Sequence, residues 1–108
     1  MTVEQTSPAV IITTDGKANV VYNHPTNLKV LQNVVDGYIE LVRISPMVLQ
    51  WLKQTYQVVL PDDSVMFCNE YGRAMNMPHN KLATGIFGMQ LLGNVIVIGN
   101  LTPEEIDE

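Results

Sequence analysis

One stretch, residues 31 to 42, most constrains what this chain can fold into, because it joins a helical pattern directly to a strand pattern. Leu28, Leu31 and Val35 recur at the spacing of one helix face, which predicts an amphipathic helix. Gly37 follows where a left-handed residue commonly ends a helix. The residues after it alternate between two faces, as in a strand. The chain must therefore turn sharply from helix to sheet at Gly37.

The N-terminal region predicts a β-hairpin. Residues 8 to 14 and 18 to 22 are two runs rich in β-branched side chains, and Asp15-Gly16 between them is a strong turn signal. We expect residues 23 to 25 to break the second strand. Thr26 is then the expected N-cap of the helix that follows.

Two further helices are predicted downstream. Ser45 and Pro46 are the residue types that start a helix, with serine as cap and proline in the first turn, and this helix should run to about Tyr56. A shorter helix is expected from Lys81 to near Gly88, and Asn80 before it is a natural N-cap.

The remaining apolar runs predict the rest of a sheet. Residues 64 to 70 form one strand, and residues 94 to 98 form another that should lie centrally, because it is apolar at every position after Asn94. Residues 57 to 60 and 74 to 77 fit short extended segments. The expected fold is α+β, a mainly antiparallel sheet of about five strands with two to three short helices packed on it.

One domain, residues 8 to 101, is expected between a flexible N-terminus at residues 1 to 7 and an acidic tail at residues 102 to 108. Charged residues make up 16% of the chain, against roughly 25% in an average soluble domain. The net charge of −5 is largely due to the tail, so the body is nearly neutral. A nearly neutral, charge-poor body favours self-association, and we expect a homo-oligomer, with a dimer as the first expectation.

Other partners and compartments are limited by what the sequence lacks. No basic cluster is present that could bind a phosphate backbone, so direct nucleic-acid binding is not expected. Cys68 is the single cysteine, which excludes an internal disulfide and fits a reducing compartment. No signal peptide is recognised and no apolar run approaches the roughly 18 residues of a membrane span. We therefore expect a cytoplasmic protein that does not associate with membranes.

Several short motifs follow one another along the chain: Leu31-Gln32, Gly37-Tyr38-Ile39-Glu40, Asn69-Glu70-Tyr71-Gly72, residues 78 to 84 and residues 93 to 99. Taken in this order, they resemble an uncharacterised small-domain family whose members are common in bacteriophages, plasmids and actinobacterial genomes. The resemblance covers roughly residues 28 to 99 and implies a phage or mobile-element protein in the host cytoplasm, without an established activity. Residues 45 to 60 depart from the family pattern, because this segment is longer and carries its own helix.

The candidate ligand-binding residues are polar or aromatic side chains within these motifs. Glu40 and Glu70 are either paired acids that clamp a ligand, or carboxylates that cap backbone amides or pair with nearby arginines. The two asparagines either line a site or form turns and helix caps, which are common roles for this residue type. The full set is Gln32, Tyr38, Glu40, Asn69, Glu70, Asn80 and Thr84.

Metal, cofactor and nucleophile chemistry are all disfavoured. His24 and His79 could join an acid in a minimal metal site, but no metal-ligand spacing supports this, and no metal is expected. No glycine pattern for binding phosphate is present, and no cofactor is expected. Cys68 lies in an apolar run and is expected to be buried and inert. Trp51 is expected in packing or in a subunit contact.

Three function classes follow. The first is a non-enzymatic phage or mobile-element accessory protein, a homo-oligomer that binds a host component or sequesters a small molecule, with an anti-defence role as one form of this. The second is a self-assembly module without a ligand. The third, ranked lowest, is a small hydrolase that uses Glu40 or Glu70 as a base.

Overall fold

The structure, a computed structural model, describes residues 5–101. The expected acidic tail and the first four residues of the expected flexible N-terminus lie outside these residues. Five strands form one antiparallel sheet in the order β2-β1-β5-β4-β3, and three helices pack on it, which confirms the predicted α+β fold. The strands are β1 (Thr6–Ile12), β2 (Ala18–Pro25), β3 (Ile39–Arg43), β4 (Val65–Asn69) and β5 (Val95–Ile98), and the helices are α1 (Leu28–Val35), α2 (Pro46–Tyr56) and α3 (Lys81–Phe87).

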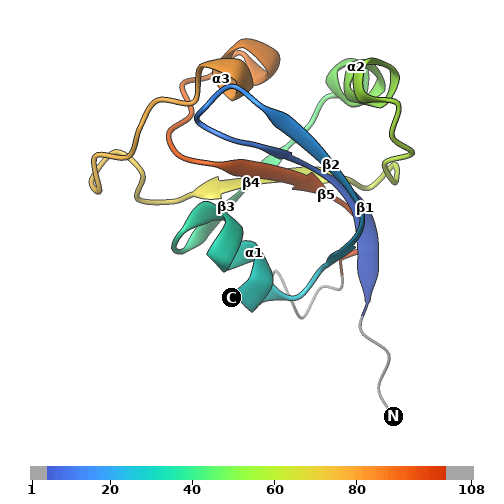
Figure 1. Ribbon diagram of the computed structural model, residues 1–108, viewed down its shortest axis with the longest axis horizontal. Coiled ribbons are helices and arrows are strands. Elements are labelled where there is room, and N and C mark those ends of the chain that lie inside the picture. Colours follow the sequence, from blue (N-terminus) through green and yellow to red (C-terminus); the bar gives the residue numbers. More distant parts are fainter. Residues whose placement is uncertain (1–4, 102–108) are drawn as a thin grey trace.

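The helices cover both faces of the sheet. In Figure 1, α1 lies on one face, and α2 and α3 lie on the other. On the α1 face, Leu31 and Val35 pack with Phe67, Ile96 and Ile98. The larger core cluster on the opposite face gathers buried side chains of α2, α3 and the three strands β1, β4 and β5 with residues of the loops between them, and partly buried residues of β2 and β3 pack against it. All of β5 is buried, as the apolar pattern of this strand predicted, and β5 lies at the centre of the sheet.

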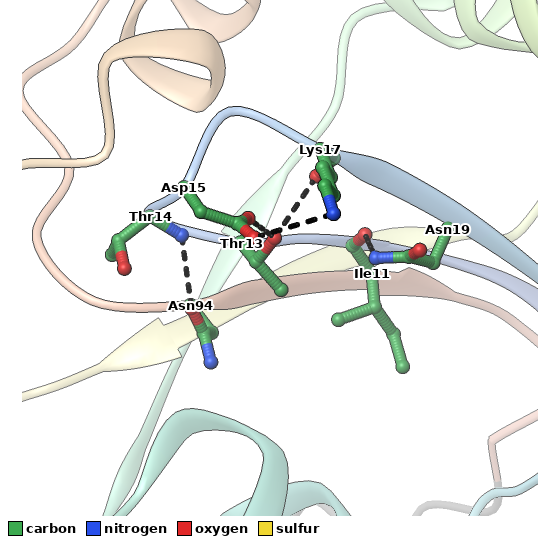
Figure 2. A network of polar contacts seen from close by, with 7 residues as sticks. All are labelled: Ile11, Thr13, Thr14, Asp15, Lys17, Asn19 and Asn94. Carbon is green, nitrogen blue, oxygen red and sulfur yellow. Dashed lines mark hydrogen bonds and ion pairs between the residues drawn. The ribbon is translucent and has the colours of Figure 1, made fainter.

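The predicted hairpin forms, with β1 and β2 joined at Asp15-Gly16. Figure 2 shows the turn: the Thr13 hydroxyl donates to the Asp15 carboxylate, and Lys17 Nζ lies 4.0 Å from the same carboxylate. The hydrogen bond from Thr13 and the charge of Lys17 lower the pKa of Asp15. The Thr14 backbone N–H donates to Asn94 Oδ1 at 3.1 Å, so the turn is tied to the residue before β5.

The second strand is longer than predicted. Residues 23 to 25 do not break β2, because His24 pairs with Ser7 and Pro25 pairs with Thr6 beyond an irregularity in the register. Proline is tolerated here because β2 is an edge strand, where a missing N–H removes no hydrogen bond from the sheet. The first strand correspondingly begins at Thr6, inside the segment predicted to be flexible.

Both ends of α1 are shifted by one residue from the prediction. The N-cap is Asn27 instead of Thr26: Asn27 Oδ1 accepts from the Val30 N–H at 3.0 Å, whereas Thr26 is buried and bonds to the Gln5 carbonyl. The C-cap is Asp36, which takes the left-handed conformation expected of Gly37. Aspartate tolerates this conformation because its short polar side chain can bond locally.

The other two helices begin and end as predicted. Ser45 caps α2 by accepting from the Val48 N–H at 3.2 Å, and Asn80 caps α3. The expected extended segments at 57 to 60 and 74 to 77 are not strands. Residues 57 to 60 form a loop that buries Val58 and Leu60 in the core, so burial rather than pairing explains their apolar character. None of the helices within residues 5–101 is long and apolar enough to cross a membrane.

Candidate functional site

The structure gathers five of the seven candidate residues around the end of β4 and places the other two on α3. We call the first group the β4 corner; it consists of Gln32, Tyr38, Glu40, Asn69 and Glu70. Gln32 and Tyr38 line one shallow hollow beside the end of α1. The other three line a second hollow of about 110 Å³. Asn80 and Thr84 lie at the start and middle of α3.

Asn69 is used by the fold. Its side chain is buried, and Nδ2 donates to the carbonyls of Val35 and Asp36 at 3.1 and 3.0 Å, so it satisfies orphan carbonyls at the end of α1. Its Oδ1 accepts from the Tyr71 N–H at 2.7 Å. A Cβ on Gly37 would lie only 2.6 Å from Nδ2, and the φ of Gly37 is +153°. Glycine is therefore needed at this position both for space and for its backbone conformation.

Asn80 is used in the same way. Its Oδ1 accepts from the Ala83 N–H at 3.0 Å, and Nδ2 donates to the carbonyls of Ile12 and Gly93 at 3.0 and 2.9 Å. The side chain is fully buried and joins α3, β1 and the loop before β5. Thr84 Oγ1 accepts from the Leu91 N–H and lies 3.1 Å from His79 Nε2.

The other members of the β4 corner are more open to solvent. Glu40 and Glu70 are both exposed, and the Glu70 N–H donates to the Tyr38 carbonyl at 2.9 Å. The Tyr38 and Tyr71 rings contact each other edge to face with centroids 6.2 Å apart. Arg73 donates to Gln90 at 3.1 Å rather than to either acid. The two carboxylates therefore lie at the rim of a small hollow and are not enclosed.

The remaining reactive side chains do not add to this corner. Cys68 is buried beside Glu40, and burial followed by the charge of that acid raises the pKa of the thiol to about 11. The thiol is therefore protonated at neutral pH and a poor nucleophile. His24 Nδ1 lies 2.8 Å from the Pro25 carbonyl. Within the described part of the chain, no three His, Cys, Asp or Glu side chains could hold a metal ion.

A larger opening lies between the two helices on the other side of the sheet from α1. We call it the α2–α3 groove. Its volume is about 480 Å³, which is within the range of small-molecule sites in proteins. The spacing of four residues places Leu82 beside Ile86, and Lys81 beside Gly85, along α3. The groove is lined by Val48 and Trp51 of α2 and by Lys81, Leu82, Gly85 and Ile86 of α3.

Trp51 and Gly85 define the walls of this groove. Trp51 is 46% exposed, and its ring is held edge to face against Tyr56 with centroids 5.9 Å apart. Gly85 has no atom within 4 Å of where a Cβ would lie, so the space in front of it is open. Leu49 and Leu52 anchor α2 to the core, which fixes the position of Trp51 on the flank of the helix.

The groove was not found by sequence reasoning. Trp51 was expected in packing or in a subunit contact, and the α3 residues were interpreted only as a short helix. Their apolar types were visible, but their facing arrangement depends on where α2 and α3 sit on the sheet. Comparison of the chain with protein-family models, curated proteins and solved structures found no match in any of the three.

Proposed function

We propose that the protein is a non-enzymatic binding protein that holds a small molecule in the α2–α3 groove. The single observation that carries this proposal is an apolar opening of about 480 Å³ with a half-exposed Trp51 as one wall. Ligand sites are typically concave, mostly apolar and supplied with few polar groups, and this groove has those properties. The resemblance to phage and plasmid proteins supports the role of a mobile-element accessory protein. In this role the protein would sequester a host metabolite.

A thermal-shift screen of host metabolites tests the proposal. A compound that binds only the folded protein stabilises it by about 2.7 kcal/mol when its concentration is 100 times the Kd. Gly85→Leu should fill the open part of the groove, so hits should lose their effect on this variant. Gly85→Ala is the matched control that adds only a methyl group. If every hit stabilises wild type and Gly85→Leu equally, the groove is not the site.

Self-assembly is the second candidate, and one observation favours it. Pro46, Met47, Gln50, Trp51 and Gln54 line one exposed surface of α2, none of them is charged, and Met47 is 84% exposed. Protein interfaces are depleted in charge and enriched in methionine and aromatic residues. Met47→Lys should shift an oligomer toward monomer in sedimentation experiments. Val59→Lys is the control, because Val59 is equally exposed but lies in the loop after α2.

A hydrolase that uses Glu40 or Glu70 has the least support, because both acids are exposed at the rim of a small hollow. Glu40→Gln and Glu70→Gln variants test it against a panel of ester, phosphate and glycoside substrates. Turnover by wild type that is lost in a folded variant would establish this class and displace the binding proposal.

A further inference from the structure

We infer that the α2–α3 groove selects an amphipathic anion, an aliphatic carboxylic acid whose tail lies in the groove and whose carboxylate lies beside Lys81. This inference rests on the function proposed above and adds the chemical class of the ligand.

The walls of the groove select the apolar part of the ligand. Val48 and Trp51 face Leu82 and Ile86 across the opening, and none of these four side chains carries a charge. Gly85 leaves open space along α3 between them. An unbranched hydrocarbon tail suits such an apolar lining, because burying each CH₂ group contributes roughly 0.8 kcal/mol without needing a polar partner.

The charge at the groove selects the polar part. Lys81 is the one charged residue that lines the groove, and no acid lines it although the chain has 11 acids and 6 bases. Within residues 5–101, Lys81 makes no ion pair, whereas Lys17 and Lys53 lie 4.0 and 3.0 Å from the carboxylates of Asp15 and Asp62. Among the described residues, the Lys81 ammonium group therefore has no carboxylate partner at the rim of this apolar opening.

The position of Lys81 couples these two features. Lys81 lies one helical turn before Gly85 on the same flank of α3, so its flexible stem can carry the ammonium group along the rim. A carboxylate at this rim would stay partly hydrated while its tail is buried. A ligand with an ammonium head group would be repelled by Lys81, and a neutral alcohol would gain only the apolar contact.

The test compares three probes that share one tail: octanoate and octylammonium, each below its micellar concentration, and octan-1-ol below its solubility limit. Binding to the full chain is measured by isothermal titration calorimetry and by the emission of Trp51, which is the single tryptophan of the chain. Octanoate should bind wild type roughly fivefold more tightly than octan-1-ol, and octylammonium most weakly, with the octanoate advantage shrinking at high salt. Lys81→Gln should weaken octanoate roughly fivefold and leave octan-1-ol unchanged. Lys29→Gln, on α1 across the sheet, is the control and should change neither.

The outcomes separate the two proposals. If octan-1-ol or octylammonium binds as tightly as octanoate, or Lys81→Gln leaves octanoate unchanged, the anion inference is overturned while the groove stands. If none of the three probes binds, the inference about the ligand class is overturned, and the groove proposal is decided by the metabolite screen. If probes bind but Gly85→Leu weakens none of them, the groove itself is overturned as their binding site. Weaker octanoate binding in both Lys81→Gln and Gly85→Leu, with Lys29→Gln unaffected, supports both proposals.

Discussion

The β4 corner and the α2–α3 groove differ in how their side chains are used. In the β4 corner, the most distinctive polar residue, Asn69, has both amide hydrogens and its oxygen bonded to backbone groups. In the groove, Trp51 and Ile86 are ordinary apolar residues that the fold leaves partly uncovered. The polar residue that looked functional in the sequence thus stabilises the fold, whereas ordinary apolar residues form the open surface. Four predictions test this contrast.

Asn80→Ala should have the largest effect on stability. It removes an N-cap and takes the Asn80 Nδ2 donor away from the buried carbonyls of Ile12 and Gly93, so the free energy of unfolding should fall by about 3 kcal/mol or more. Urea denaturation measures the change. Asn33→Ala, at an exposed position of α1, is the control and should cost less than about 0.5 kcal/mol. If Asn80→Ala lowers the free energy of unfolding by less than about 1 kcal/mol, the fold does not depend on the hydrogen bonds of Asn80.

Gly37→Ala should come next, with a loss of about 1–3 kcal/mol, because its φ is +153° and the new Cβ would meet Asn69 Nδ2. A double-mutant cycle with Asn69→Ala separates the two causes. The clash disappears in the Asn69→Ala background, so Gly37→Ala should cost about 1 kcal/mol less there. An equal cost in both backgrounds would assign the whole effect to the backbone conformation of Gly37.

Gly85→Ala should have a smaller effect of the opposite sign. Alanine favours a helix interior over glycine, and nothing lies within 4 Å of the new Cβ, so the variant should be more stable by about 0.5–1 kcal/mol. Thermal unfolding of the apo protein measures the shift. Destabilisation would mean that the space in front of Gly85 is filled, and the contrast between the two regions would then fail.

The smallest effect concerns Cys68 and is a dependence of stability on pH that begins only above about pH 9. Because the pKa of the folded thiol is raised from 9.0 to about 11, the folded state favours the protonated form. This contribution is fully present below pH 9 and is lost as pH rises through about 11. Stability should therefore fall between these values more steeply in wild type than in Cys68→Ala. Identical slopes would mean that the thiol titrates alike in the folded and unfolded chain.

Most of the fold could be predicted from local signals in the sequence. Ser45-Pro46 and Asn80 set the starts of α2 and α3 by capping chemistry, which acts within one helical turn and can be recognised in sequence. The turn at Asp15-Gly16 and the central, fully apolar β5 were similarly predictable. These features depend on neighbours in the chain or on burial of a whole strand, and both leave a pattern in the sequence.

The errors arose where distant contacts decide the outcome. Pro25 remains in β2 because Thr6 pairs with it, and Asp36 rather than Gly37 ends α1, with Asn69 lying close against Gly37. The groove depends on the placement of two helices that are separated by the 24 residues between Tyr56 and Lys81. No local pattern encodes that placement, so the residues of the groove could be predicted as helical but not as neighbours.

The order of the strands has a consequence for how the chain reaches this fold during synthesis. β2 pairs only with β1, and β3 pairs only with β4. The sheet therefore consists of two separate strand pairs until β5 joins them. Because β5 is the last strand of the described chain, nearly all of residues 5–101 must emerge from the ribosome before the five-stranded sheet can form. A nascent chain stalled before Val95 would expose the inner edges of β1 and β4 at the same time, and such unpaired edges are sites of aggregation.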